Sequence, residues 1–282
     1  MKVLITGGNG QLGQCINFVN NDYPELELYF TNSKELDITD KELVYSFFRN
    51  KSFDYVINCA AYTNVEQAEK EPKKAFLVNA EGAKNLAEVC KEYKVILIHI
   101  STDYVFDGKK HTPYTEDDVP NPINEYGKSK LLGEQYIREA MDEYFIIRTS
   151  WLYSQFGHNF YKTILKKLKI EKELTIVSSE MGTPTNANDL AEFIIAIVKS
   201  GSSQYGVYHY SNQGQATWYD FGKDIVRLSG KENMIRFKKI DNYPTFAERP
   251  KYSVLDKTKI TDVFEIRPME WRSSLKKMNF LF

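Results

Sequence analysis

Cysteine is scarce in this sequence, and the few cysteines are far apart. Three are present, Cys15, Cys59 and Cys90, with no CxxC pair among them. An odd and widely spaced set indicates neither a disulfide framework nor a zinc site. No cluster of His, Asp and Glu has metal-ligand spacing either. We therefore expect no metal site, and we interpret the cysteines as small buried apolar residues.

Long apolar runs and an excess of one charge are also lacking. The apolar run within residues 1–7 is far shorter than a signal-peptide core, and no later run approaches the roughly 20 residues that span a bilayer. The formal net charge is -1, which gives no electrostatic reason to bind nucleic acid or a membrane surface. We expect a cytoplasmic protein with neither of these partners.

Apolar segments of strand length alternate with segments of helical period in the first half of the chain. The predicted strands cover residues 2–6, 26–31, 55–58, 95–100 and 145–149, and the clearest predicted helices cover residues 74–92 and 125–141. Such alternation is typical of βαβ units. We predict an α/β fold with a Rossmann-type doubly wound parallel sheet.

The pattern loosens after Trp151. Residues 161–168 and 188–199 have helical period, whereas residues 182–185 and 243–245 have the composition of loops. We predict a smaller mixed α/β region over residues 151–282 that binds the substrate, with some of its segments returning to the sheet of the first domain. Ligand sites in such folds lie beyond the carboxyl ends of the parallel strands.

A glycine-rich loop follows the first predicted strand directly. Gly7, Gly10 and Gly13 have the spacing of a dinucleotide-binding turn, Gln11 and Leu12 lie between the last two, and a segment of helical character follows from Gln14. The first glycine permits the tight turn, the second lets the backbone approach a pyrophosphate, and the third packs helix against strand. We predict that residues 1–150 form an NAD(P)-binding domain with these five residues at the cofactor.

The choice between NADH and NADPH is left open by the second predicted strand. Dinucleotide sites commonly place a carboxylate ~20 residues after the glycines, where it binds the ribose 2'-hydroxyl. Here that strand ends in Thr31-Asn32-Ser33-Lys34, which contains no acidic residue. We therefore expect NADH or NADPH as cofactor.

Tyr126 and Lys130 are one helical turn apart, so they share a helix face. The same spacing recurs at Tyr219 and Lys223, but only the first pair follows a strand that ends in Ser101-Thr102. Ketone reduction needs a proton donor at oxygen, and a lysine ammonium nearby is expected to lower the pKa of the tyrosine. We predict Tyr126 as the proton donor, with Lys130 and Thr102 assisting it.

A glycine in the first turn of this predicted helix needs a reason. Gly127 follows the candidate proton donor directly, and an exposed helical glycine costs about 1 kcal/mol relative to alanine. Our hypothesis is that a side chain at this position would crowd the nicotinamide or the substrate. A broken local rule beside a functional residue is typical of a constrained site.

The sequence resembles the dTDP-4-dehydrorhamnose reductases, a family of extended short-chain dehydrogenases/reductases, from Lys2 to about Trp271. Besides the glycine loop and the Tyr126 and Lys130 pair, the resemblance rests on Leu36-Asp37-Ile38-Thr39-Asp40, Asn58-Cys59-Ala60-Ala61-Tyr62-Thr63, Val78-Asn79-Ala80, Ser101-Thr102-Asp103-Tyr104-Val105-Phe106-Asp107-Gly108, Arg148-Thr149-Ser150-Trp151 and Gly182-Thr183-Pro184-Thr185. It implies reduction of the C4 ketone of dTDP-4-dehydro-6-deoxy-L-mannose to dTDP-L-rhamnose, a precursor of cell-surface polysaccharide.

The resemblance also implies roles for single residues. Asp37 and Ile38 would hold the adenine, although Asp37 has the alternative interpretation of a helix cap. The other implied cofactor contacts are Ala61, Tyr62, Thr63 and Asn79, together with Tyr126 and Lys130. The implied substrate contacts are Thr102, Asp103, Tyr104 and Trp151. Arg249 is a further candidate for a substrate phosphate, with a surface ion pair as its alternative.

Two residues depart from the family pattern at a site that holds magnesium in some relatives. Some relatives are thought to dimerise around magnesium held by glutamates, where this sequence has Cys15 and Asn188. Metal binding is therefore not expected, and a homodimer is only one option.

The alternative functions are another nucleotide-sugar reductase, epimerase or dehydratase, and a binding subunit like that of methionine adenosyltransferase. Tyr104 stands where dehydratases carry the Glu of Thr-Asp-Glu, and the complete Thr102, Tyr126 and Lys130 set argues against a binding subunit.

Overall fold

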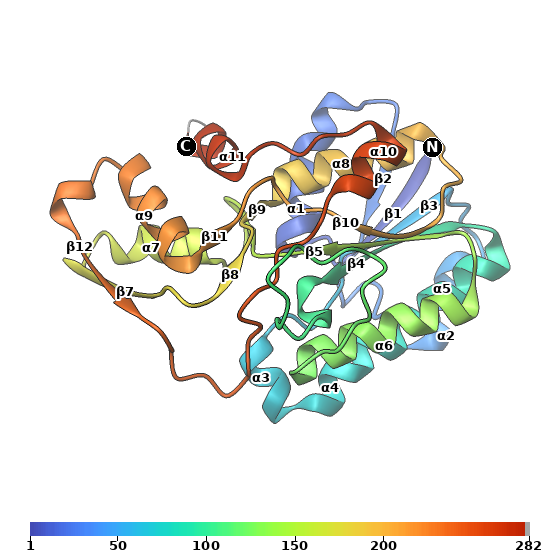
Figure 1. Cartoon of the computed structure of the whole chain (residues 1–282). Coiled ribbons are helices and arrows are strands. Elements are labelled where there is room, and N and C mark those ends of the chain that lie inside the picture. Colours follow the sequence, from blue (N-terminus) through green and yellow to red (C-terminus); the bar gives the residue numbers. More distant parts are fainter. Residues whose placement is uncertain (280–282) are drawn as a thin grey trace.

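The computed structural model describes residues 1–279 of the chain. Its centre is a six-stranded sheet in the order β10-β5-β4-β3-β1-β2, and every neighbouring pair of strands is parallel (Figure 1). The strands are β1 Lys2–Thr6, β2 Glu27–Phe30, β3 Tyr55–Asn58, β4 Ile96–Thr102, β5 Tyr144–Thr149 and β10 Gly206–His209. The predicted parallel α/β sheet is confirmed, and β10 adds an edge strand from the second half of the chain.

Helices cover both faces of this sheet, because its strands are apolar on both sides. On one face the buried residues of α1 (Gln11–Val19) and α8 (Ala187–Ser200) share an apolar core with β1, β3 and β5. On the other face α2 (Lys41–Phe48), α5 (Gly82–Tyr93) and α6 (Glu125–Ala140) form a second core (Figure 1). The doubly wound arrangement that the sequence predicts is therefore present.

The predicted helix over residues 74–92 is in fact broken into three pieces. They are α4 (Pro72–Phe76), a single π-helical turn, η2 (Leu77–Glu81), and α5. The interruption contains Asn79, whose buried side chain bonds the backbone of Tyr62 and the hydroxyl of Ser129. π-Helical turns inside helices often mark functional positions, and this turn faces the region where the strands end.

A smaller region with its own apolar core lies beside the sheet, at the left of Figure 1. Its helices are α7 (Phe160–Lys167), α9 (Trp218–Leu228) and α11 (Trp271–Asn279), and its strands are β7 (Glu173–Val177), β8 (Met181–Gly182), β11 (Ala216–Thr217) and β12 (Arg236–Ile240). Two further short strands, β6 (Leu152–Tyr153) and β9 (Thr185–Asn186), pair with each other and connect this region to the sheet. The remaining elements are α3 (Val65–Lys70), α10 (Thr258–Phe264) and the 3-10 turns η1 (Asn20–Asp22), η3 (Asp103–Val105) and η4 (Glu232–Met234).

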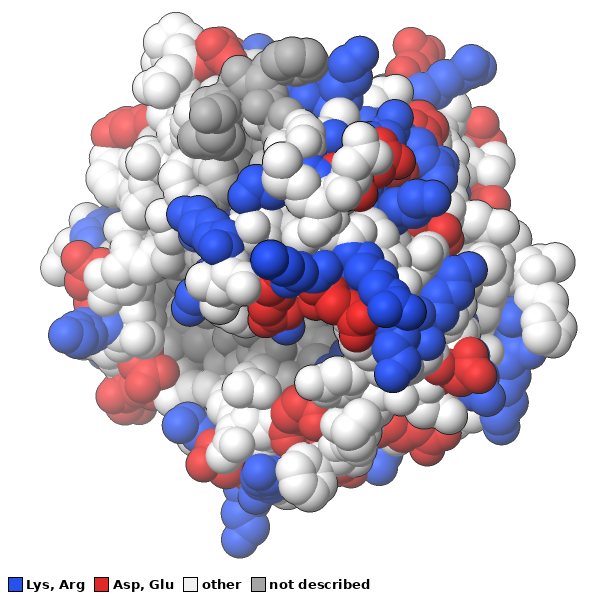
Figure 2. Space-filling view, turned by 90° about the vertical axis from the view of Figure 1, so that its left-hand side faces the viewer, with Lys and Arg blue, Asp and Glu red and all other residues white. Residues whose placement is uncertain are grey.

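The surface agrees with the composition. Figure 2 shows Lys and Arg interspersed with Asp and Glu over the face that the smaller region presents. Within residues 1–279, no helix combines the length and apolarity needed to cross a bilayer.

Candidate active site

The glycine loop packs so closely against its neighbours that side chains are excluded. Gly7 has φ +65°, and a Cβ atom there would lie 2.6 Å from the backbone nitrogen of Ala60 at the end of β3. A Cβ on Gly13 would lie 2.6 Å from the Cα of Gly8. These contacts bring the N-terminus of α1 to the carboxyl ends of β1 and β3, which is where dinucleotide phosphates bind in such folds.

A cavity of about 680 Å³ opens beside this loop. Six of the predicted cofactor contacts line it: Gly7, Gly10, Asp37, Ile38, Ala61 and Tyr62. Asn32, Ser33, Lys34, Thr39 and Val78 also line it, and these were not among the predicted contacts. The cavity has the volume of a ligand site, and its wall runs from the glycine loop past the end of β2.

The other predicted cofactor contacts lie outside the wall of this cavity: Gln11, Leu12, Gly13, Thr63, Asn79, Tyr126 and Lys130. Leu12 is buried in the apolar core, and the Gln11 side chain accepts a hydrogen bond from Asn159. The Asn79 amide bridges the Tyr62 backbone and the Ser129 hydroxyl, so its hydrogen-bonding groups are already engaged within the protein. Their contact with a cofactor stays a prediction.

Asp37 is not the cap of the helix that follows it. Its Oδ1 accepts hydrogen bonds from the backbone nitrogen and the hydroxyl of Thr39, at 2.9 and 2.8 Å. The cap of α2 is Asp40, whose Oδ1 accepts from the backbone nitrogen of Leu43 at 3.0 Å. Asp37 is therefore free of the capping role and lies in the cavity wall.

The three predicted catalytic residues come from two adjacent elements. Thr102 ends β4, and Tyr126 and Lys130 lie in the first two turns of α6. Thr102 is buried, and its hydroxyl donates to Asp103 Oδ1 at 3.1 Å. The pKa of Tyr126 is raised to about 12 by burial, while a hydrogen bond with Thr102 opposes that rise and the charge of Asp103 adds to it. Thr102 and Tyr126 therefore act on each other directly.

The expected lowering of the tyrosine pKa by Lys130 is wrong for this structure. The Lys130 ammonium points instead to the backbone carbonyl of Ile100, to which it donates at 2.6 Å, and to His99 Nε2 at 3.2 Å. Lys130 is 2% exposed, and burial lowers its own pKa to about 8, against an opposing contribution from Glu134. Burial therefore dominates the titration of both groups.

His99 is the partner of Lys130 that the sequence analysis left out. The Asn58 side chain is oriented by its oxygen, which accepts from the Thr6 hydroxyl at 2.7 Å and from a backbone nitrogen at 3.1 Å. Its amide nitrogen therefore donates to His99 Nδ1 at 3.0 Å. A neutral imidazole carries one proton, so that proton lies on Nε2 and faces the Lys130 nitrogen. This arrangement favours the uncharged amine, in the same direction as burial.

Position 127 requires glycine because it packs against the backbone of another segment. This contact replaces our hypothesis that a side chain there would crowd the nicotinamide or the substrate. A Cβ atom on Gly127 would lie 2.2 Å from the backbone oxygen of Tyr104 and 3.0 Å from Pro122. The cap residue Asn124 accepts from the Gly127 nitrogen at 2.8 Å and donates to the Glu248 carbonyl. The glycine thus lets the start of α6 pack directly on the segment that follows Thr102.

A buried ion pair behind the catalytic residues ties α6 to the sheet. Glu134 accepts three hydrogen bonds from Arg148 of β5, the shortest at 2.7 Å, and one from the Ser101 hydroxyl at 2.5 Å. Neither charged side chain is more than 2% exposed. The sequence analysis missed this pair, and the signal available was an arginine inside an otherwise apolar strand.

The predicted substrate contacts surround the same end of the sheet. Burial raises the pKa of Asp103 to about 7 and also raises the pKa of Tyr104. The Tyr104 ring lies edge-on to the Tyr126 ring, with centroids 5.9 Å apart. Arg249 donates to Glu66 at 3.0 Å, and its Nε is buried without a hydrogen-bond partner in the described part of the chain. Arg249 lines a cavity of about 530 Å³ next to this group.

Trp151, a predicted substrate contact, has one ring face covered by another tryptophan. Its backbone has φ +45°, a strained conformation for a large residue. One face of the indole stacks on Trp218 with centroids 3.6 Å apart, and the ring lies so close to Gly182 that a Cβ there would be 2.6 Å from it. The contact of Trp151 with a sugar stays a prediction. Trp218, which donates to Glu180 at 3.0 Å, was missed by the sequence analysis.

Two residues that bear on the magnesium question lie on the helices of one face. Cys15 of α1 is buried, and the Asn188 amide of α8 exchanges hydrogen bonds with Gln155. Across residues 1–279, no group of three or more His, Cys, Asp and Glu side chains is placed to hold a metal ion.

A family model described as the RmlD substrate binding domain matches residues 1–280. The chain belongs to this family. It is 37% identical to the dTDP-4-dehydrorhamnose reductase of Aggregatibacter actinomycetemcomitans, over 98% of each chain. It is 42% identical to the spore coat polysaccharide biosynthesis protein SpsK of Bacillus subtilis, over 98% of this chain and 96% of that protein. The resemblance predicted from the sequence is confirmed.

Solved structures of the RmlD family give the same result. The dTDP-4-dehydrorhamnose reductase of Bacillus anthracis, solved in complex with NADP, is 37% identical and superposes with a TM-score of 0.95 over 100% of this chain and 99% of that one. The predicted fold class, a Rossmann-type sheet with a smaller mixed region, is confirmed by this match and by the strand order described above.

Proposed function

We propose that the protein is an NAD(P)H-dependent oxidoreductase that reduces the C4 ketone of dTDP-4-dehydro-6-deoxy-L-mannose to dTDP-L-rhamnose, for cell-surface polysaccharide. The observation that carries the proposal is the direct interaction of Thr102 with Tyr126 at the carboxyl end of β4, with Lys130 one turn behind. Membership of the RmlD family supports the same activity.

The residues around the glycine loop fit a dinucleotide. Gly7 and Gly13 leave no room for side chains, and α1 begins without an acidic residue that would repel phosphate. The bound cofactor supplies hydride to the substrate carbon. The cavity past β2 is lined by Asn32, Ser33 and Lys34, so its end contains a cation and hydrogen-bonding groups. We therefore propose that NADH and NADPH are both accepted, because a 2'-phosphate meets no carboxylate directly after the strand.

The chain's own residues then handle the proton. Tyr126 donates its proton to the ketone oxygen, and the Thr102 hydroxyl stabilises the charge that develops there. Lys130 in its ammonium form is the acid that restores the proton to Tyr126. Its pKa of about 8 is lower than that of the tyrosine, about 12, so this transfer runs downhill. The two side chains share one helix face, and the exchange requires the Lys130 side chain to turn from the Ile100 carbonyl toward Tyr126.

The alternative activities lack specific parts. A dehydratase needs the Thr-Asp-Glu carboxylate pair, and Tyr104 occupies the third position, with its ring against Tyr126. A binding subunit would not need a buried lysine with a perturbed pKa beside a tyrosine and a threonine. We also propose that the enzyme is cytoplasmic and has no nucleic-acid or membrane partner. A homodimer linked by magnesium is not part of the proposal, because Cys15 and Asn188 replace the glutamates that would bind the metal.

Turnover against a panel of 4-keto nucleotide sugars tests the proposal. NADH and NADPH oxidation is followed with each sugar, and the configuration of each product is determined. We expect oxidation of both cofactors with the dTDP-linked L-mannose derivative and a dTDP-L-rhamnose product. If no sugar of the panel supports oxidation, the reductase proposal is wrong. A product of another configuration instead assigns the chain to a different 4-keto sugar.

A further inference from the structure

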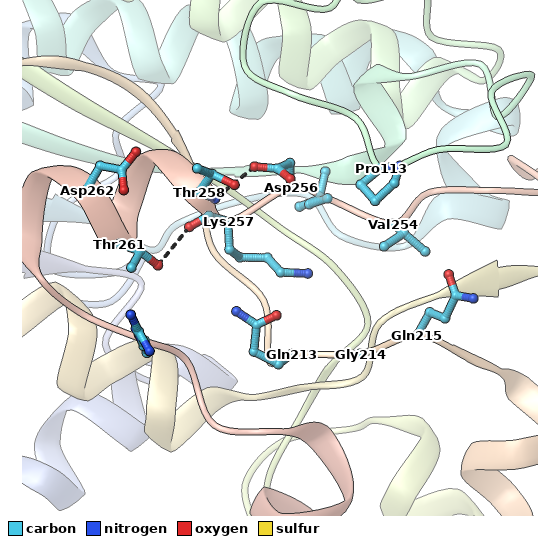
Figure 3. A pocket seen from close by; sticks show the side chains of 12 residues that line it. Pro113, Gln213, Gly214, Gln215, Val254, Asp256, Lys257, Thr258, Thr261 and Asp262 are labelled. Carbon is cyan, nitrogen blue, oxygen red and sulfur yellow. Dashed lines mark hydrogen bonds between the residues drawn. The ribbon is translucent and has the colours of Figure 1, made fainter.

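A third cavity, of about 490 Å³, lies at the outer edge of the sheet (Figure 3). Its walls come from Pro113, from residues 213–215 after β10, and from residues 254–258 at the start of α10, with Thr261, Asp262 and Arg267 completing them. None of these residues lines the cavity beside the glycine loop or the one beside Arg249. The cavity is therefore separate from the proposed cofactor and substrate sites.

Backbone hydrogen bonds hold these walls together. The nitrogen of Tyr114 donates to the Val254 carbonyl at 2.8 Å, and the nitrogen of Asp256 donates to the Tyr114 carbonyl at 2.7 Å. The backbone nitrogen of Gln213 donates to the Met269 carbonyl, and the Gln213 carbonyl accepts from the backbone nitrogen of Trp271 at 3.0 Å. Three segments that are far apart in the sequence are joined in this way, so the cavity is preformed.

Lys257 is the unusual residue of this cavity. Its side chain is 7% exposed, and its amino group extends into the cavity, toward Gln213 (Figure 3). Among the described residues that ammonium has no hydrogen-bond or ion-pair partner. Burying a charged amine without a partner is costly, and burial lowers the pKa of Lys257 to about 8, against the opposing charge of Asp256. The amine is thus still mostly charged at neutral pH.

The groups around Lys257 are mainly hydrogen-bond donors that the protein leaves unused. The side chains of Gln213, Gln215 and Arg267 have no partner within residues 1–279. Asp256 is engaged elsewhere, because its Oδ1 accepts from the backbone nitrogen of Thr258 at 2.8 Å (Figure 3). Asp262 lies on the exposed side of α10. The cavity therefore offers an incoming anion the Lys257 ammonium and the half-buried Gln213 amide, with the Gln215 amide and the Arg267 guanidinium at its exposed side.

We propose that this cavity is a second ligand site, which binds a small phosphate-bearing molecule through the ammonium group of Lys257. A phosphate carries several strong acceptor oxygens and can use the ammonium, the guanidinium and the amides together. The volume exceeds that of a single ion, so the phosphate is attached to a small organic body. Binding of the anion supplies the partner that the protein itself does not give to Lys257.

Calorimetric titration with inorganic phosphate and with glycerol 3-phosphate tests the proposal, with glycerol and acetate as comparison ligands. Lys257→Met removes the charge and keeps the length of the side chain, and Lys238→Met is the matched control on the exposed strand β12. We expect Lys257→Met to weaken the binding of glycerol 3-phosphate at least about tenfold, as loss of a charged hydrogen bond does. Lys238→Met should not change it.

The pH dependence provides a second measurement. Binding of a phosphate favours the charged lysine, so affinity is highest between the second pKa of the phosphate ester, about 6, and the free lysine pKa of about 8, and it falls as pH rises through the latter. Equal affinity in the wild type and in Lys257→Met overturns the proposal, as does the absence of binding by the wild type. If acetate binds as tightly as phosphate, the assignment to phosphate is wrong. A melting temperature of Lys257→Met at or above the wild-type value shows that the variant is folded.

Discussion

Two tyrosine-lysine pairs with the same spacing lie in two regions of the molecule, and their surroundings differ. Tyr126 and Lys130 of α6 lie at the carboxyl end of the sheet, and Lys130 is 2% exposed. Tyr219 of α9 packs against Phe237 and under the Lys239 ammonium, whereas Lys223 is exposed. Helical spacing therefore places two side chains on one face but does not make a site. The adjoining strand end and the burial it imposes distinguish the first pair.

The largest difference between the two pairs is expected in catalysis. Tyr126→Phe removes the proposed proton donor, and general acids typically contribute a factor of about 10²–10⁴ to the rate. We expect kcat to fall by about that factor while cofactor affinity stays nearly the same, as measured by steady-state kinetics and by titration of NADPH fluorescence.

Tyr219→Phe is the matched control, because it removes the same hydroxyl from the same helical spacing. We expect its kcat to equal that of the wild type. Full activity of Tyr126→Phe, or an equal loss in both variants, would remove the distinction between the two regions.

The buried ion pair should make α6 sensitive to a charge deletion that the second region tolerates. Glu134→Ala leaves Arg148 buried without its carboxylate, which typically costs about 3–5 kcal/mol of unfolding free energy. Glu171→Ala breaks an exposed pair with Lys167, which is worth about 0–1 kcal/mol. Urea unfolding of both variants measures these values, and similar losses in the two would contradict the argument from burial.

Glycines in the two helices give the next comparison. Gly127→Ala forces a Cβ to within 2.2 Å of the Tyr104 carbonyl, which cannot move without shifting the backbone after Thr102. We expect a loss of about 1–3 kcal/mol of unfolding free energy together with reduced kcat.

Gly222→Ala in α9 meets only the flexible end of Ile176, at 2.6 Å. The gain in helix propensity, about 1 kcal/mol, offsets much of that contact. We expect a change close to zero in both unfolding free energy and activity. If Gly127→Ala is the more stable protein and is fully active, the glycine is only a tolerated defect.

A further expected effect is on stability at low pH. Burial lowers the pKa of His99 and of His209 well below the ordinary value, so in the folded protein both stay neutral where the unfolded chain begins to take up protons. The two histidines should therefore lower the unfolding free energy as pH falls below about 6.5, by up to about 1.4 kcal/mol per pH unit each. Asp103, whose pKa burial raises to about 7, opposes this slope by up to the amount of one group. Urea unfolding between pH 5 and 8 measures the slope.

The same two histidines should differ in tautomer. His99 accepts at Nδ1 from Asn58, whereas His209 donates from Nδ1 to the Tyr114 carbonyl at 3.1 Å and accepts from Arg148 at Nε2. Nitrogen NMR should find the proton of His99 on Nε2 and that of His209 on Nδ1. A proton on Nδ1 of His99 would contradict the proposed contact with Lys130.

The hydrophobic pattern of the sequence predicted most of the central sheet, because parallel strands buried on both faces have continuous apolar sequences. It did not predict the break between α4 and α5, since the π-helical turn is accompanied by contacts of Asn79 with residues 17 and 50 positions away. The glycine loop was readable for a related reason. The turn needs glycine at fixed positions because neighbouring backbone packs closely against it, and these positions are visible in the sequence. The contacts that a Cβ on Gly7 or Gly13 would make show this close packing.

The sequence by itself determined which residues we predict to carry the chemistry of this chain: the glycines after β1, Thr102 at the end of β4, and the pair Tyr126 and Lys130. Local spacing and strand order are enough for that. Only the tertiary structure decided their electrostatics and their supports. Burial raises the Tyr126 pKa and lowers that of Lys130, and His99 and Glu134 reach Lys130 from a strand and from the next helical turn. Desolvation depends on all the surrounding atoms, which no short stretch of sequence contains.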